Sequence, residues 1–119
     1  MNAFIHGLCL ACALGMALPA NAAIKVLATT SDWGSLVTEL GGDKVNVYTA
    51  TSPLQDVHRV DAKPSLVARA RSADLIVATG AELESGWLPQ LLRQSGNQKV
   101  AGGTGVFEAA RQVKTLQKP

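Results

Sequence analysis

The sequence predicts an α/β fold in which helices flank a parallel sheet. Short runs of β-branched and apolar residues alternate along the chain with segments whose apolar residues recur at helical spacing. One run, residues 75–78 (Leu-Ile-Val-Ala), is wholly apolar, which is typical of a strand covered on both faces. Because helices separate the strands, the strands should be parallel and joined by right-handed crossovers. A length of 119 residues allows one domain at most.

The first 22 residues predict a cleavable signal peptide. They contain no Lys, Arg, Asp or Glu, and residues 5–18 are largely apolar. Ala20-Asn21-Ala22 places small residues at the two selective positions of a signal-peptidase site. A membrane anchor is the alternative, but the apolar run is short for a bilayer and is interrupted by His, Gly and Pro. We therefore expect an exported, periplasmic protein whose mature part is residues 23–119.

The mature part has a nearly balanced charge. All eleven basic and nine acidic residues lie in it, which leaves a net charge of +2. Since the basic residues are mostly scattered, this balance predicts no nucleic-acid partner. Cys9 and Cys12 leave with the signal peptide, so the mature chain offers no disulfide and no thiolate ligand. The residues before Cys12 also make a poor lipoprotein signal.

The first elements expected in the mature part are a buried strand at residues 24–29 and a helix. Thr30-Ser31-Asp32 supplies capping residues, and Gly41-Gly42 predicts the helix end. Between them an apolar stripe recurs at helical spacing: Trp33, Leu36, Val37 and Leu40. We interpret Trp33 as a core residue of this stripe rather than a residue that stacks on a ligand.

A second strand is expected at residues 45–49, and a long loop over residues 50–64 follows it. Ser65 is a natural N-cap for the second helix. Its buried side is marked by Leu66, Ala70 and Ala73.

A third helix is expected to start near Ser85 or Gly86 and to stop at Gly96, after the strand at residues 75–78. We interpret Glu82 and Glu84 as charges at its positive end rather than as catalytic carboxylates. Its apolar side comprises Trp87, Leu88, Leu91 and Leu92. A short fourth strand is expected at residues 99–101, and a helical turn at residues 106–110.

The loop between the second strand and the second helix carries the candidate metal ligand. It contains His58, the only histidine apart from His6, between Asp56 and Asp61. Because the loop leaves the carboxyl end of a parallel strand, it should lie on the ligand-binding edge of the sheet. A neutral imidazole whose second nitrogen is oriented by a carboxylate is a common metal ligand. The residues alone leave two interpretations open, a metal ligand and a solvated loop histidine.

Motifs of nucleotide-binding and hydrolytic sites are absent from the sequence. It contains no P-loop, no GxGxxG and no nucleophile elbow, and Gly102-Gly103-Thr104-Gly105 does not have phosphate-loop spacing. The sequence therefore offers no catalytic motif of these classes.

Several segments, taken in order, resemble the metal-binding receptors of zinc and manganese ABC importers. They begin with the residues from Lys25 to Thr30 and from Gly42 to Val47, and continue with Asp56-Val57-His58, Pro64-Ser65, residues 73–77 and residues 84–88. In this family the Asp-x-His motif usually reads Asp-Pro-His, and its histidine is the first metal ligand. The resemblance therefore implies that His58 is a metal ligand, although Val57 replaces the proline and makes the loop less rigid.

The resemblance also implies an architecture and a role. Family members have two α/β lobes with the metal, zinc or manganese, held between them by four side chains, and they deliver it to a membrane permease. The resemblance therefore implies a binding protein and not an enzyme. Residues 23–119 would then be most of the amino-terminal lobe, and we expect the remaining ligands beyond Pro119. Two alternatives stay open: an exported α/β domain that has lost its metal function, and an exported enzyme domain of another kind.

Overall fold

The computed structural model describes residues 21–116 and confirms the α/β fold. A four-stranded, wholly parallel sheet has the strand order β2-β1-β3-β4. The strands are β1 (Ile24–Ala28), β2 (Val45–Thr49), β3 (Leu75–Ala78) and β4 (Val106–Glu108). The predicted signal peptide lies almost wholly outside the described residues. Within residues 21–116, no helix combines the length and the apolar character needed to cross a membrane.

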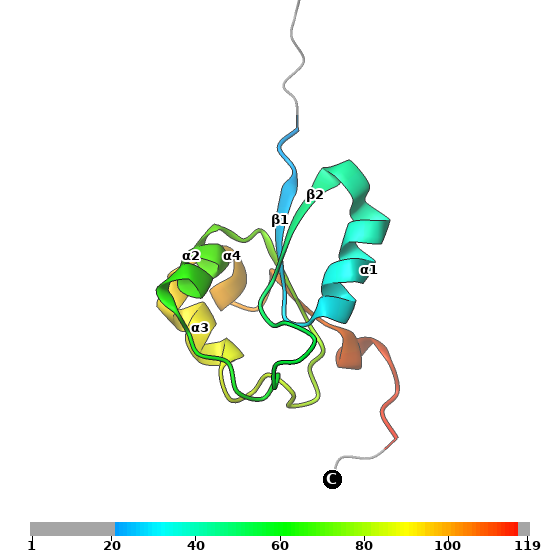
Figure 1. Ribbon diagram of the computed structural model, residues 1–119, viewed down its shortest axis with the longest axis vertical. Helices are drawn as coiled ribbons and strands as arrows, with labels where there is room; N and C mark the ends of the chain where they lie inside the picture. Colours follow the sequence, from blue (N-terminus) through cyan, green and yellow to red (C-terminus); the bar gives the residue numbers. More distant parts are fainter. Residues whose placement is uncertain (1–20, 117–119) are drawn as a thin grey trace, which may run out of the picture.

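Helices cover both faces of the sheet. They are α1 (Ser31–Gly41), α2 (Pro64–Ser72), α3 (Leu88–Ser95) and α4 (Gln98–Ala101), with short 3₁₀ helices η1 (Gly42–Lys44) and η2 (Ala109–Gln112). In Figure 1, α1 lies on one side of the strands, whereas α2, α3 and α4 gather on the other. The sheet is therefore the middle layer of three, and its two faces bury different amounts of apolar surface.

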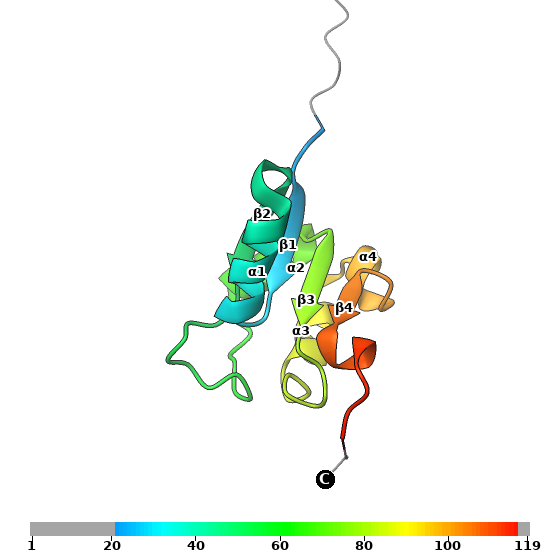
Figure 2. The same cartoon turned by 90° about the vertical axis from the view of Figure 1, so that its right-hand side faces the viewer.

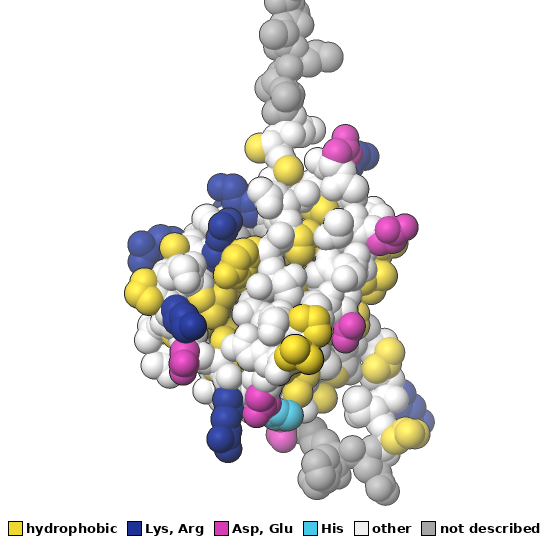
Figure 3. Space-filling model, in the orientation of Figure 1, with side chains coloured by type: hydrophobic (Ala, Val, Ile, Leu, Met, Phe, Trp, Pro, Cys, Tyr) yellow, Lys and Arg dark blue, Asp and Glu magenta, His cyan; other side chains and the backbone are white. Residues whose placement is uncertain are grey.

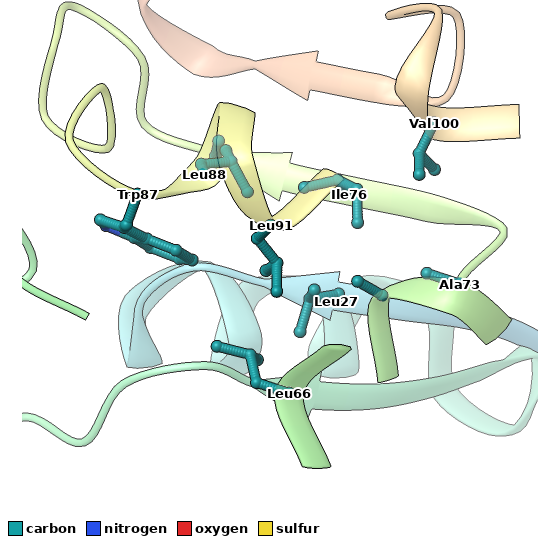
Figure 4. Packing of buried hydrophobic residues seen from close by; sticks show 10 residues of the cluster. Leu27, Leu66, Ala73, Ile76, Trp87, Leu88, Leu91 and Val100 are labelled. Atoms are coloured by element: carbon teal, nitrogen blue, oxygen red, sulfur yellow. The ribbon is translucent and has the colours of Figure 1, made fainter. Parts of the chain in front are cut away.

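The main core lies between the sheet and the helices α2 and α3. Leu27 of β1 pairs in register with Ile76 of β3, so both side chains leave the same face of the sheet. They meet Leu66 of α2 and Leu91 of α3, and all four are buried (Figure 4). Burying each such side chain contributes about 1.5–3 kcal/mol. This cluster holds the carboxyl ends of β1 and β3 in a fixed relation.

Helix α1 differs from the predicted arrangement of its apolar stripe. The side chains of Leu36 and Leu40 remain 46% and 79% exposed. The helix instead packs against the sheet through Gly34, which is buried. The contact is so close that a Cβ atom at this position would overlap the side chain of Thr49. A glycine, which has no side chain, permits this close approach, while the two leucines stay largely exposed.

The predicted elements after Gly96 were wrong for residues 99–101 and 106–108, whereas the predicted helical turn is present from Ala109, where η2 begins. Residues 98–101 form helix α4, and residues 106–108 form strand β4 in place of a helical turn. The Asn97 side chain explains the first difference, because its oxygen accepts a hydrogen bond from the Lys99 backbone N–H at 3.1 Å and so caps the helix. Pairing with β3 explains the second, with Val106 opposite Ile76.

Two helix starts also differ from the prediction. Helix α2 begins at Pro64 rather than after Ser65, which suits the fixed φ of proline in a first turn. Helix α3 begins at Leu88, two or three residues later than expected. The residues before it form a loop in which Gly80, Ala81 and Glu82 all have left-handed backbone, with φ of 78°, 50° and 71°.

Candidate metal site

The candidate site lies at the carboxyl edge of the sheet. Because all four strands are parallel, the loops after them emerge at one end of the molecule, where the loops after β2 and β3 are seen in Figure 2. Residues from the loops after β1, β2 and β3 line a cleft of about 410 Å³ at this edge. A larger cavity of about 510 Å³ lies between the loop after β3 and η2. Val57 lines the first cleft, but His58 lines neither.

His58 lies in the loop over residues 50–63 and contacts Asp56 in two ways. Its backbone N–H donates to Oδ1 of Asp56 at 2.9 Å, and its ring nitrogen Nδ1 lies 2.9 Å from the same oxygen. Both side chains face solvent, with His58 68% exposed. Figure 3 shows histidine and acidic side chains together at the lower end of the molecule.

These contacts settle which atoms of the pair are engaged. The backbone N–H and then the ring of His58 hold the pKa of the Asp56 carboxyl below its usual value of 3.8. Asp56 is therefore ionised at neutral pH, and it favours a proton on Nδ1 of the ring. The Nε2 lone pair of a neutral imidazole then points away from Asp56, which is the arrangement that a metal-ligating histidine needs.

The structure separates the two aspartates that flank His58 in the sequence. Asp56 orients the ring, whereas no hydrogen bond joins Asp61 to His58 among the described residues. Within residues 21–116, no three His, Cys, Asp or Glu side chains converge as a metal site requires. The described part of the chain thus brings together one imidazole and one carboxylate.

Glu84 has a role that the sequence did not reveal. Its side chain is 3% exposed and lies between the ends of β1 and β3. Oε1 accepts hydrogen bonds from Oγ1 of Thr29 at 2.7 Å and from the backbone N–H of Thr79 at 2.8 Å, and Oε2 accepts from Gly80 N–H at 3.0 Å. The interpretation of Glu84 as a helix-terminus charge was therefore wrong: this carboxylate joins two strand ends.

The position of Glu84 restricts what the site can bind. The strand order places β1 between β2 and β3, and ligands of open parallel sheets bind outside the carboxyl ends at such a switch point. Here a carboxylate occupies the gap between β1 and β3 and takes up the backbone N–H groups of Thr79 and Gly80. Those N–H groups are not available to a phosphate, and a negative charge beside them disfavours anions.

Comparison with known proteins identifies the family. The family model described as zinc-uptake complex component A, periplasmic (ZnuA) matches residues 26–118. The chain belongs to the ZnuA family. This result confirms the resemblance to zinc and manganese receptors that the motifs indicated.

Individual ZnuA-type relatives agree with this assignment. The metal ABC transporter substrate-binding lipoprotein FimA of Streptococcus parasanguinis is 30% identical over 96 residues, which cover 78% of this chain and 31% of FimA. The manganese ABC transporter substrate-binding lipoprotein PsaA of Streptococcus pneumoniae is 30% identical over 97 residues, with the same coverage. The chain thus spans about a third of the length of these relatives.

A solved structure supports the ZnuA-type fold. The periplasmic metal binding protein from Candidatus Liberibacter asiaticus superposes with a TM-score of 0.56 and 24% sequence identity. The superposition covers 67% of this chain and 28% of that protein. At this identity the likeness concerns the fold.

Proposed function

We propose that the chain supplies the amino-terminal metal-binding lobe of a periplasmic receptor that delivers zinc or manganese to the membrane permease of an ABC importer. Membership of the ZnuA family supports this role, as do relatives named as metal and manganese substrate-binding proteins. The charge-free apolar start of the chain supports export. The function is binding and transfer of a cation, without a catalysed reaction.

In this proposal His58 is a metal ligand and binds the cation through Nε2. The observation that carries the assignment is the double contact of His58 with Asp56, which engages Nδ1 and directs Nε2 outward at the carboxyl edge. An imidazole suits zinc well, whereas manganese prefers oxygen ligands. A complete site needs three or four protein ligands, so the others come from outside the described residues.

The alternative of an exported enzyme or nucleotide-binding domain has less support. Such a domain would use the crevice at the switch point of the sheet, where Glu84 is already bonded to both strand ends. The alternative of a domain without metal function is distinguished from our proposal by the expected effect of replacing one residue, His58. It predicts that replacing His58 has no consequence.

Uptake measurements test the proposed role. In cells that encode the protein, deletion of its coding sequence should reduce uptake of radioactive zinc or manganese, and the affected ion identifies the cargo. The wild-type gene should restore uptake, and His58→Ala should not. Asp61→Ala is the matched control, because it alters the same loop without touching the His58–Asp56 pair. Full restoration by His58→Ala would remove His58 from the site.

A further inference from the structure

The loop that carries His58 has few ties to the rest of the molecule. At its start the Ala50 backbone N–H donates to the Ala28 carbonyl and the Thr51 hydroxyl donates to the Thr29 carbonyl. Within the described part of the chain, residues 52–62 form hydrogen bonds with other residues of the loop, with one exception. That exception is the indole N–H of Trp87, which donates to the Val57 carbonyl at 2.7 Å.

Trp87 is a rigid donor. Its side chain is 5% exposed and belongs to the main core, where Figure 4 shows it at the end of the cluster beside Leu88. The backbone N–H groups of Trp87 and Leu88 both donate to the Glu84 carbonyl, while the Glu84 side chain is bonded to the ends of β1 and β3. The orientation of the indole is therefore set by the core and the sheet, not by the loop.

The bond from Trp87 acts on the peptide unit that leads into His58. This unit consists of the Val57 carbonyl and the His58 N–H. Its oxygen accepts from the indole of Trp87, and its N–H donates to Asp56. Asp56 in turn contacts Nδ1 of the His58 ring, so rotation of this one peptide unit would displace both contacts of the imidazole.

The peptide unit that follows His58 also lies close to the segment that contains Trp87. A Cβ atom added to Gly86 would lie 3.1 Å from the His58 carbonyl oxygen, which is closer than an ordinary van der Waals contact. Gly86 and Trp87 thus touch the backbone on both sides of the His58 Cα atom.

We infer that Trp87 is a positioning residue for His58: its indole N–H holds the Val57–His58 peptide so that the imidazole presents Nε2 to the cation. This inference rests on the proposed function, since it assigns to Trp87 a part in the same site. The hydrogen bond also makes the loop more rigid, because Val57 lacks the ring by which a proline would fix the backbone angle φ at this position.

The test compares two tryptophans whose indole N–H groups donate to different acceptors. Trp87→Phe keeps a buried aromatic ring and removes the N–H. Trp33→Phe is the matched control, because Trp33 also loses an indole hydrogen bond, in its case one of 2.8 Å to Oγ1 of Thr79, which is not a residue of the His58 loop. The exported, ¹⁵N-labelled chain is titrated with Zn²⁺, and the imidazole nitrogens of His58 are followed by NMR.

We expect Trp87→Phe to weaken zinc binding at His58 by about threefold to tenfold, the effect of one hydrogen bond, and to lower the heteronuclear NOE of residues 56–59. Trp33→Phe should leave both readouts at their wild-type values. If Trp87 served the core alone, Trp87→Phe would lower the unfolding midpoint and leave both readouts unchanged, and that result would overturn the inference.

Two further outcomes separate this inference from the proposed function. If zinc does not shift the wild-type His58 nitrogens, the assignment of His58 as a metal ligand in the proposed function fails, and the heteronuclear NOE still decides whether Trp87 orders the loop. If Trp87→Phe does not fold, Gly86→Ala replaces it, because the added methyl group displaces the His58 carbonyl without removing a core side chain. Wild-type zinc binding and NOE values in Gly86→Ala would then refute the inference.

Discussion

Replacing Glu84 with Gln should destabilise the fold although the side chain keeps its size. The Glu84 carboxylate is buried and accepts hydrogen bonds from Thr29, Thr79 and Gly80. A glutamine has one acceptor oxygen and one NH₂ group. If the oxygen retains Thr29 and Thr79, the NH₂ group faces the Gly80 N–H, so two donors meet and neither is satisfied.

The magnitude follows from these contacts. A hydrogen bond to a charged group is worth about 1.5–3 kcal/mol, and a buried donor without a partner costs about 1–3 kcal/mol. Because the loop after β3 can relax and admit water, we expect Glu84→Gln to lower the free energy of unfolding by about 2 kcal/mol. Glu84→Ala leaves three donors without a partner and should cost more. Small domains have about 5–15 kcal/mol in total, so either loss is large.

Urea denaturation followed by circular dichroism measures this difference. The control is Glu82→Gln, which makes the same charge change two residues earlier on an exposed side chain and should shift stability by less than about 0.5 kcal/mol. Equal unfolding free energies for Glu84→Gln and Glu82→Gln would refute the role of Glu84 as a link between β1 and β3.

Three further predictions concern other parts of the chain. Gly34→Ala should lower the urea midpoint, although alanine normally favours a helix interior, because the new methyl group would overlap Thr49; a raised midpoint would contradict the close packing of α1. The hydrogen bond from Lys99 holds the pKa of the Asp74 carboxyl below 3.8, so its stabilising effect is present above that pH and is lost as the pH falls through the lowered pKa. NMR titration should find that Lys99→Met raises this pKa, and an unchanged value would exclude the ion pair. Mass spectrometry of the exported chain should find a first residue at Ala23, whereas an intact chain would argue against cleavage.

The fold was predictable where local patterns and tertiary packing agree. The apolar run at residues 75–78 is a buried strand because both faces of β3 are covered by other elements. The pattern misled where packing decides: Leu36 and Leu40 repeat at helical spacing, yet α1 meets the sheet through Gly34. β4 is three residues long and depends on pairing with β3, so no local period reveals it.

The candidate site was predictable only in part, because its contacts differ in sequence separation. Asp56 and His58 are two residues apart, so their pairing could be anticipated from the sequence. The bond from Trp87 to Val57 spans 30 residues and that from Thr29 to Glu84 spans 55. Such contacts depend on which strands are neighbours, and no spacing rule encodes that. The sequence therefore suggested that Glu84 is a charge at a helix terminus, whereas its hydrogen-bond partners follow the ends of two strands, β1 and β3.

Anomalous diffraction from crystals of residues 23–119 grown with zinc tests the central claim most directly. Data collected on both sides of the zinc absorption edge locate the ion without reference to the protein atoms. We predict a zinc peak about 2.0–2.1 Å from Nε2 of His58, with Nδ1 still bonded to Asp56. A zinc peak bound only to other side chains, with the His58 ring free of metal, would contradict the assignment of His58 as a ligand.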